Sequence, residues 1–342
     1  MPDSLEQRVE RYRPLIVEEM RAVVGKSDDE LFRWMRYHLG WETEDGTPID
    51  ASGGKLMRPV AMLMAAEFVG GSAEQTVPAA AAVELVHNFS LLHDDIEDAS
   101  PTRRGRATLW TFAGTAQAIN TGDGMFTLAR LAMHRLLDRD IAPDRAIEAI
   151  RRLDETCIKL VHGQYLDISF ETRETVSREQ YLAMARGKTA AMFAAPFAIG
   201  ALLGGAPDAQ VAALHDFGEQ VGLAFQAVDD VLGIWGDEDV TGKPVGDDLR
   251  SRKMTLPVIV ALEAGGDEAH RLTAAYTNAG AAGDDVSEMA ALVERLGGRA
   301  ATERFAEERV AAALGARDAV ELTAEALEAC SQFAGAATGR QS

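Results

Sequence analysis

The sequence predicts an all-α protein built as a single helical domain. Apolar residues recur at the three- and four-residue spacing of amphipathic helices along most of the 342 residues, whereas strand-like alternation is scarce. Short segments rich in glycine, proline, aspartate and serine separate these stretches and are typical of loops. Hydrophobic residues make up 47% of the chain, which is enough for a sizeable core. None of the loops is long and polar enough for a linker, so we expect one domain over residues 1–342.

Each expected helix ends where a glycine-rich or acidic segment interrupts the apolar periodicity. Residues 5–24 and 28–39 are periodic up to the glycine-bearing segment 40–54, and the pattern of 58–68 stops at a Gly-Gly-Ser turn, 70–72. The later helices are expected at 76–97, 116–138, 145–170, 177–203, 209–235 and 256–264, with loops at 99–106, 204–208 and 236–252. From residue 268 the chain is alanine-rich and helical again, and it ends in a short polar tail, 335–342.

Composition and charge argue against several classes of partner. The chain has 54 acidic and 34 basic residues, a formal charge of −20, whereas nucleic acids need a basic face and anionic membranes attract one. Only Cys157 and Cys330 are present, so neither a disulfide framework nor a thiolate zinc site is expected. No apolar stretch approaches the roughly 18 residues of a spanning helix, and no charged start precedes an apolar run. We expect a cytoplasmic protein without a membrane span.

Two acidic clusters lie inside expected helices, and both suit a divalent cation. The first covers residues 94–98, Asp-Asp-Ile-Glu-Asp, and the second begins with Asp229 and Asp230. Residues four apart lie on one helix face, so Asp94 and Asp98 present two carboxylates toward one point. Mg²⁺ is typically held by one or two carboxylates, with waters and substrate phosphates completing its shell. The two clusters together indicate a diphosphate held from both sides.

A diphosphate site also needs basic groups, and several flank the acidic clusters. Residues 53–58, Gly-Gly-Lys-Leu-Met-Arg, lie where a helix should begin, and helix starts attract anions through their backbone amides. Arg103 and Arg104 follow the first cluster in a turn-like segment, and arginine pairs well with phosphate oxygens. The lysines near the second cluster are Lys188, Lys243 and Lys253.

The motifs as a set resemble those of the trans-isoprenyl diphosphate synthases, the polyprenyl synthetases that condense isopentenyl diphosphate with an allylic diphosphate. They occur in the family's order from about residue 53 to 257. The resemblance implies an antiparallel helical bundle of the isoprenoid synthase type with a central active-site cavity. The matching residues are Gly53-Gly54-Lys55, Arg58-Pro59, His87, Leu91-Leu92-His93-Asp94-Asp95, Asp98, Arg103-Arg104, Gly163-Gln164, Asp167, Lys188-Thr189, Phe225-Gln226, Asp229-Asp230, Lys243 and Lys253.

The resemblance also implies a cofactor, Mg²⁺, with two or three ions in each active site. Asp94, Asp95 and Asp98 would bind the Mg²⁺ that bridges the allylic diphosphate, and Asp229 and Asp230 would hold a further ion. The expected reaction is ionisation, condensation and proton loss. Cations stabilise the leaving diphosphate, so no protein nucleophile is needed, and the departing diphosphate is a plausible base.

The same resemblance assigns the remaining residues to the two substrates. Lys55, Arg58, His87 and Arg104 would bind the diphosphate of isopentenyl diphosphate. Thr189 and Gln226 would stabilise positive charge developing on the allylic fragment. The residues that would neutralise the allylic diphosphate are Arg103, Lys188 and Lys253, with Lys243 nearby.

One position departs from the family's pattern. The second aspartate motif usually has a third acid where this chain has Gly233, which reduces the expected set to Asp229 and Asp230, with Asp237 as a candidate helper. The third metal ion is therefore less firmly expected than the first two.

Product length depends on how deep the pocket beyond Asp94 is. Upstream residues on the same helix lie deeper by about 1.5 Å each. Phe89 is bulky and Ser90 is small. In the family, aromatics at both positions usually give a fifteen-carbon product, whereas a single aromatic at the deeper one resembles twenty-carbon synthases. We therefore favour geranylgeranyl diphosphate, formed from dimethylallyl, geranyl or farnesyl diphosphate, over farnesyl diphosphate.

Two functions of other classes are alternatives to the synthase. A class I terpene cyclase on a similar scaffold would have no use for the isopentenyl diphosphate residues Lys55, Arg58, His87 and Arg104. A non-catalytic partner subunit would have no reason to keep both acidic clusters. Family members are usually homodimers, and the helix expected at 116–138 is a candidate interface.

Overall fold

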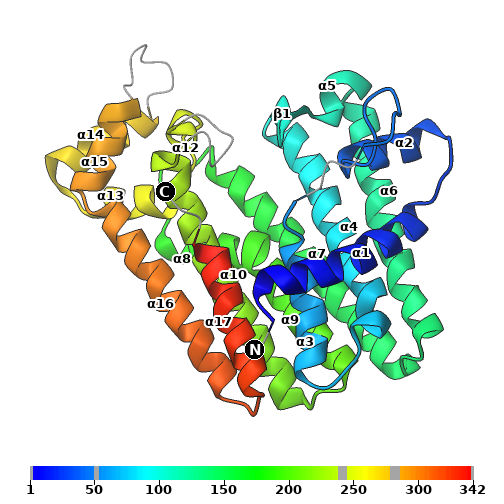
Figure 1. The fold of residues 1–342 in the computed structure, drawn as a ribbon. Coiled ribbons are helices and arrows are strands. Elements are labelled where there is room, and N and C mark those ends of the chain that lie inside the picture. The colour runs from blue at the N-terminus through cyan, green and yellow to red at the C-terminus, as the bar shows by residue number, and fades with distance from the viewer. Residues whose placement is uncertain (1–2, 50–53, 238–244, 278–285, 340–342) are drawn as a thin grey trace. The chain divides into compact units, whose positions relative to one another are not determined.

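The computed structural model describes residues 3–49, 54–237, 245–277 and 286–339 (Figure 1). The expected all-α class is confirmed, since the elements are helices apart from one small two-stranded sheet within the described ranges. The chain divides into two compact units. The first contains Met1–Cys157, Ala195–His215 and Val320–Ala329, and the second contains Ile158–Ala194, Asp216–Ala319 and Cys330–Ser342. The assignment of residues 1–342 to one domain stays a prediction.

The helices lie close to their expected positions. The first unit contains α1 (Leu5–Val24), α2 (Glu30–His38), α3 (Met57–Phe68), α4 (Ala73–Glu97), β1 (Thr102–Arg103), β2 (Arg106–Ala107), α5 (Leu109–Ala113), α6 (Thr115–His134) and the 3₁₀ turn η1 (Arg135–Arg139). The second contains α8 (Arg178–Ala185), the π-helical turn η2 (Arg186–Ala190), α12 (Asp247–Arg250), α13 (Leu256–Glu263), α14 (Gly266–Thr277), α15 (Val286–Arg295) and α16 (Gly298–Asp318). Four helices contribute residues to both: α7 (Pro143–Phe170), α9 (Ala191–Gly204), α10 (Asp208–Trp235) and α17 (Ala324–Thr338).

Three local features differ from the expectation. The segment expected as a loop at 99–106 forms an antiparallel hairpin, in which Thr102 pairs with Ala107. The helix expected over 177–203 is interrupted by η2, and π-helical turns often occur at functional sites. The loop expected at 236–252 contains α12, which begins after Gly246 in the left-handed conformation (φ 77°). Each element is too short to give a periodic pattern in the sequence.

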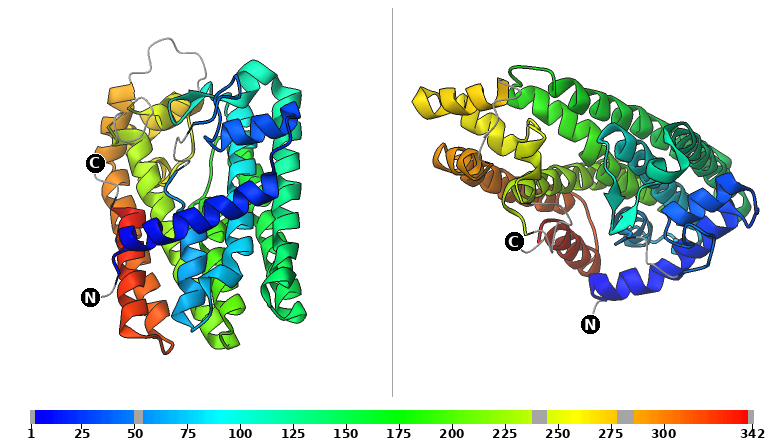
Figure 2. Two further views of the ribbon diagram at one scale, coloured as in Figure 1. Left: turned by 45° about the vertical axis from the view of Figure 1, so that its right-hand side comes forward. Right: turned by 90° about the horizontal axis from the view of Figure 1, so that it is seen from above.

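Helix α4 forms the centre of the first unit and packs against α1, α3 and α6 (Figure 2). Residues 76–86 of this helix are buried, with the alanine run 79–82 inaccessible to solvent. Small side chains let neighbouring helices approach closely. The same holds for α3 and α9, where a Cβ added to Gly200 would lie 2.1 Å from the carbonyl oxygen of Met62. The close packing fixes α4, whose C-terminal end carries the first acidic cluster.

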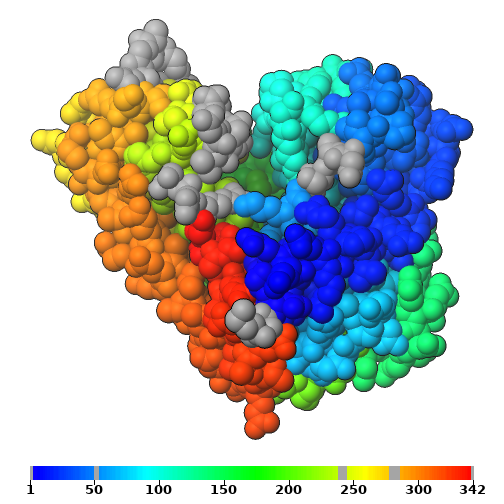
Figure 3. All heavy atoms as spheres, in the orientation of Figure 1, coloured from blue at the N-terminus to red at the C-terminus, as the bar shows by residue number. Residues whose placement is uncertain are grey.

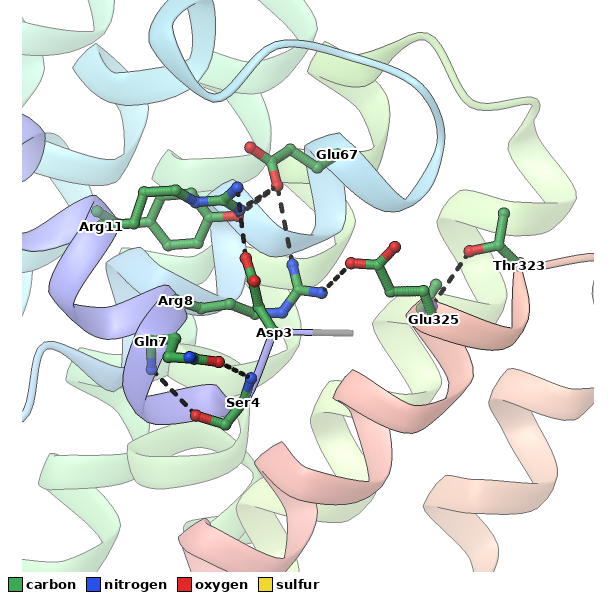
Figure 4. Close-up of polar contacts among 10 residues, drawn as sticks. Asp3, Ser4, Gln7, Arg8, Arg11, Glu67, Thr323 and Glu325 are labelled. Atoms are coloured by element: carbon green, nitrogen blue, oxygen red, sulfur yellow. Dashed lines mark hydrogen bonds and ion pairs between the residues drawn. The ribbon is translucent and has the colours of Figure 1, made fainter. Parts of the chain in front are cut away.

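Helix α1 lies at the surface of the first unit and is fixed there by a buried arginine (Figures 3 and 4). Ser4 and Gln7 cap its start reciprocally. Arg8, only 3% exposed, donates to Glu325 at 2.6 Å and lies 3.9 Å from Glu67. Tyr12 also donates its hydroxyl hydrogen to Glu67. The network connects α1 to α3 and to the first turn of α17.

One stretch of the described chain, Arg178–Gly204, is long and apolar enough to span a membrane by length and composition. Of the 18 most apolar consecutive residues in this stretch, 83% are buried inside the structure. A core helix passes the same test, so this burial identifies the stretch as part of the protein interior.

Candidate active site

The first acidic cluster lies at the C-terminal end of α4. Asp94 is partly exposed, Asp98 is exposed and caps the helix, and Asp95 is only 1% exposed. Asp98 keeps helical backbone angles, and its amide donates to the carbonyl of Asp94 at 2.8 Å. The expected i, i+4 relationship between Asp94 and Asp98 therefore holds to the end of the helix.

Arg103 from strand β1 neutralises the buried Asp95. Its Nε donates to Asp95 Oδ1 at 2.6 Å. Burial raises the pKa of Asp95, and the guanidinium of Arg103 opposes that rise. The other carboxylate oxygen, Oδ2, is buried and accepts no hydrogen bond from the described residues. One oxygen of Asp95 is thus fixed by arginine while the second keeps its capacity to bind a cation.

The residues expected to bind isopentenyl diphosphate come together beside this cluster in the first unit. Arg58 Nη1 lies 3.3 Å from His87 Nε2. Removal from water and the charges of Arg58 and Arg104 hold the pKa of His87 well below its usual range, so the ring is neutral and Nε2 accepts the arginine hydrogen. The guanidinium of Arg104 lies over Gly54, where an added Cβ would be 3.0 Å from Nη2. Lys55 is exposed next to Gly54.

Glu84 is a residue of this site that the sequence analysis missed. It lies one turn before His87 on α4, is 4% exposed, and its carboxylate accepts a hydrogen bond from Asn88 Nδ2 at 3.0 Å. Burial raises the pKa of Glu84 to about 7, although the charges of Arg58 and Arg104 act against the rise. The signal available in the sequence was a single acid in an otherwise apolar run, three residues before His87.

A pocket in the first unit joins the acidic cluster to further basic residues. Its lining includes His38, Asp95, Arg103, Arg104 and Arg106. Burial and the three arginines lower the pKa of His38 to about 3, so this imidazole is neutral. Arg106 has a structural role, because its guanidinium donates to the backbone carbonyls of Tyr37 and Glu42. Those distances are 2.7 and 2.8 Å. The pocket therefore has a positive lining with one carboxylate in it.

The two residues expected to set product length differ in their surroundings. Phe89 is 8% exposed and packs against Phe126 of α6, with ring centroids 4.9 Å apart, and against His93. Ser90 is partly buried and donates its hydroxyl hydrogen to the carbonyl of His87. Phe126 was not singled out from the sequence, because the contact depends on how α4 and α6 pack.

In the second unit, two glycines bring Lys188 to α7. A Cβ added to Gly163 would lie 2.1 Å from the amide nitrogen of Lys188, and one added to Gly187 would lie 2.6 Å from the carbonyl oxygen of Lys159. The backbones of α7 and η2 therefore touch. The ammonium of Lys188 pairs with the carboxylate of Asp167, one turn after Gly163. The motif residues Gly163, Asp167 and Lys188 are thus one packing unit.

Thr189 and Gln226, expected to act on the same substrate fragment, are hydrogen-bonded to each other. The hydroxyl of Thr189 donates to the side-chain oxygen of Gln226, whose Nε2 donates to Asp230 Oδ1 at 2.8 Å. Asp230 Oδ2 accepts from the hydroxyl of Tyr181 at 2.7 Å and from the amide of Leu256 at 2.8 Å. Burial raises the pKa of Asp230 to about 7 against these three donors.

The aspartates of the second cluster thus have different surroundings. Asp230 is 3% exposed, whereas Asp229, the residue directly before it on α10, is exposed. Asp248 of α12 lies at the face of α10 that carries Gly233, since an added Cβ there would be 1.9 Å from Asp248 Oδ2. Lys253 follows α12, and its amide donates to the carbonyl of Asp248. Gly53 and Lys243 lie outside the described residues.

The first cluster fits a divalent cation on the chemistry of its donors. Asp94 and Asp98 share a helix face, and Asp95 Oδ2 is a buried oxygen with no hydrogen-bond donor in the described chain. Within the ranges that the structure describes, no group of three or more acidic, histidine or cysteine side chains is arranged so that it could hold a metal ion. Mg²⁺ rarely needs one, because waters and substrate phosphates supply its other ligands.

The fold and the site define an all-α enzyme whose carboxylates and arginines suit a metal-bound diphosphate. Structures of the same fold include a polyprenyl synthetase from Streptomyces coelicolor A3(2). It has a TM-score of 0.89 and 41% identity and covers 97% of this chain and 99% of that one. Another is geranylgeranyl pyrophosphate synthase from Corynebacterium glutamicum, complexed with isoprenyl diphosphate and magnesium. It has a TM-score of 0.83 and 26% identity and covers 99% of this chain and all of that one, 100%.

The chain belongs to the polyprenyl synthetase family, whose model matches residues 47–293. A geranylgeranyl diphosphate synthase of Mycobacterium tuberculosis is 46% identical over 281 residues, 82% of this chain and 79% of that protein. A (2E,6E)-farnesyl diphosphate synthase of the same species is 43% identical over 289 residues, 83% of this chain and 79% of that protein. The family expected from the sequence motifs is therefore confirmed.

Proposed function

We propose that this chain is a Mg²⁺-dependent geranylgeranyl diphosphate synthase that extends allylic diphosphates with isopentenyl diphosphate. The observation that carries the proposal is the presence of two separate groups of site residues in the first unit. Asp95 with Arg103 forms one, and Arg58 with His87 and Arg104 forms the other. A chain-elongating prenyltransferase handles two diphosphates, whereas a cyclase handles one.

The acidic set is proposed to serve the allylic substrate. When Mg²⁺ is bound, it stabilises the negative charge of the leaving diphosphate. Asp94, Asp95 and Asp98 are the residues that would hold it in the first unit, and Arg103 both orients Asp95 and neutralises the diphosphate. The relative whose structure contains magnesium and isoprenyl diphosphate supports magnesium as the cation.

The basic set is proposed to hold isopentenyl diphosphate by its charged end. Arg58, Arg104 and Lys55 supply positive charge, and neutral His87 keeps Arg58 in place by accepting its hydrogen bond. Glu84 interacts electrostatically with Arg58 and Arg104, so its negative charge offsets the repulsion between the two arginines.

Residues of the second unit are proposed to act on the allylic fragment after ionisation. Lys188 and Lys253 would neutralise the departing diphosphate. The hydroxyl of Thr189 and the amide oxygen of Gln226 would present negative dipoles to the developing carbocation. The hydrogen bond between Thr189 and Gln226 fixes both groups before the reaction, which is the property electrostatic catalysis needs. The final proton would leave to the diphosphate.

Product length is proposed to be set by the Phe89 side chain, with Ser90 leaving the pocket open above it. The geranylgeranyl diphosphate synthase among the relatives supports a twenty-carbon product. A fifteen-carbon product is the second candidate, because a relative of 43% identity is named a farnesyl diphosphate synthase.

We also propose a cytoplasmic homodimer. On α7, Ile158, Val161, Tyr165 and Ile168 recur at helical spacing and are all exposed. On α6, Ile119 and Leu131 are exposed as well. Such faces are typical of an interface with a second copy. Sedimentation velocity on the wild type and on an Ile158→Glu variant tests the proposal, since the variant should sediment as a monomer.

Product analysis tests the enzyme assignment directly. Purified protein is incubated with Mg²⁺, isopentenyl diphosphate and, separately, the five-, ten- and fifteen-carbon allylic diphosphates. A single prenyl diphosphate of twenty carbons that requires both substrates is expected. A fifteen-carbon product would support the second candidate, and a hydrocarbon or alcohol from an allylic diphosphate alone would contradict chain elongation.

A further inference from the structure

We propose that the carboxylate of Asp248 replaces the acid absent at position 233 and, together with Asp229, forms the second cation site. The inference rests on the proposed Mg²⁺-dependent function and names the residues of its second metal site. It concerns only α12 and the part of α10 from Asp216 onward, which both belong to the second unit.

Gly233 leaves room that Asp248 fills. A Cβ built on Gly233 would lie 1.9 Å from Asp248 Oδ2 and 2.5 Å from its Cγ, distances at which two side chains cannot coexist. Gly233 lies four residues after Asp229, so both positions are on one face of α10. The Asp248 carboxylate therefore occupies the place where a third acid of the motif would begin.

Backbone geometry, rather than a flexible contact, brings Asp248 to this place. Helix α12 begins after Gly246, whose left-handed conformation (φ 77°) glycine adopts without strain. Leu249 is fully buried and anchors the short helix in the core of the second unit. The amide of Lys253 donates to the carbonyl of Asp248 at 2.9 Å and closes the turn.

Asp230 is committed to another role. Its two oxygens accept hydrogen bonds from Tyr181, Gln226 and the amide of Leu256, at 2.7 to 2.8 Å, and it is 3% exposed. These contacts connect α8, α10 and the start of α13. Asp230 thus acts as a buried anchor, which leaves Asp229 and Asp248 as the carboxylates of the cation site.

Two carboxylates are enough for the cation in question. Mg²⁺ is usually bound by one or two carboxylates, and diphosphate oxygens and waters complete its octahedral shell. The glycine at position 233 is therefore needed for Asp248 to occupy its place, because any larger residue there would displace the Asp248 carboxylate.

Mn²⁺ binding in the presence of inorganic diphosphate, followed by electron paramagnetic resonance, tests the inference without turnover. Wild type, Asp248→Asn, Asp229→Asn and the neighbouring control Asp247→Asn are compared. Asp248→Asn and Asp229→Asn should each weaken one Mn²⁺ site by about tenfold or more, while Asp247→Asn should match wild type. Wild-type-like binding by Asp248→Asn beside weakened binding by Asp229→Asn would overturn the inference. Absence of Mn²⁺ binding by the wild type would instead overturn the proposed metal dependence.

A reciprocal exchange tests the replacement itself. Gly233→Asp alone should weaken Mn²⁺ binding, because its side chain overlaps the Asp248 carboxylate. The double variant Gly233→Asp with Asp248→Ala should bind Mn²⁺ more tightly than Asp248→Ala alone. If the double variant melts like the wild type and still binds no better than Asp248→Ala, position 233 and Asp248 are not equivalent and the inference fails.

Discussion

Arg103 Nε donates to Asp95 Oδ1 at 2.6 Å, which couples the short hairpin to the acidic end of α4. The carboxylate is 1% exposed, and its second oxygen accepts no hydrogen bond from the described residues. We propose that this contact leaves the other oxygen for a cation and that the same arginine meets the phosphate bound to it.

Replacing Arg103 by alanine should lower kcat by about 10²- to 10³-fold, the usual effect of removing one preorganised group that stabilises developing charge. The variant should also melt at lower temperature, since Asp95 would be left buried without its partner. Arg103→Lys keeps the charge but not the Nε geometry, so it should recover only part of the activity. Steady-state kinetics with both substrates and thermal melts check these outcomes. Full activity in Arg103→Ala would contradict the role of this contact.

Glu84 makes stability depend on pH. Its pKa is about 7 in the folded protein and ordinary in the unfolded chain, so the folded state binds more protons between about pH 4.5 and 7. Its contribution is fully present below that window and is lost as pH rises through 7. The contribution of Glu84 to the free energy of unfolding should fall by up to about 1.4 kcal/mol for each pH unit there.

Glu84→Gln should remove this slope while keeping the hydrogen bond with Asn88. The charged groups facing Glu84 are Arg13 of α1, Arg58 of α3 and Arg104 of the hairpin. None of them titrates between pH 5 and 7. Urea unfolding of wild type and variant at pH 5, 6 and 7 measures the difference. Parallel curves for the two proteins would rule out Glu84 as the source.

The pair Phe89 and Phe126 should limit product length. Phe89→Ala removes the ring from α4 and should shift the main product beyond twenty carbons. Phe126→Ala should act in the same direction, because the two rings are in contact at 4.9 Å. Ser90→Phe adds an aromatic above Phe89 and should shorten the product to fifteen carbons. Chromatography of the dephosphorylated products identifies each length, and unchanged products in all three variants would place the floor elsewhere.

Most of the fold could be predicted from the sequence because its helices are long and periodic. The helix expected at 5–24 is observed at Leu5–Val24, and the one expected at 209–235 is observed at Asp208–Trp235. The hairpin of β1 and β2 and the turn η2 were missed, because two-residue strands and a five-residue π turn leave no pattern in the sequence.

The site was predictable as a set of residues but not as a set of contacts. The motifs identified Asp95, Arg103 and Asp230, yet nothing in the sequence distinguishes the exposed Asp229 from the buried Asp230 beside it. That difference arises from Tyr181 and Leu256, which are 49 and 26 residues away in the chain. Glu84 was overlooked for the same reason, since its importance comes from arginines on three other segments.

Gly163 should be intolerant of even the smallest side chain. In Gly163→Ala the new Cβ would lie 2.1 Å from the amide nitrogen of Lys188. The atoms that it meets are backbone atoms of Gly187 and Lys188, so no flexible side chain can move aside to make room. We expect a loss of about 3 kcal/mol in the free energy of unfolding, in the range for overpacking a tight contact. A displaced Lys188 should also raise KM for the allylic diphosphate.

The matched control is Gly315→Ala in α16, where an added Cβ would meet no described atom within 4 Å. That change should stabilise the protein by about 0.5 to 1 kcal/mol, because alanine loses less backbone freedom than glycine in a helix. Chemical denaturation of both variants measures the contrast, and steady-state kinetics separates the effect on Lys188 from the effect on folding. Equal stability changes in the two variants would mean that α7 and η2 do not touch at Gly163, and the glycine would then need another explanation.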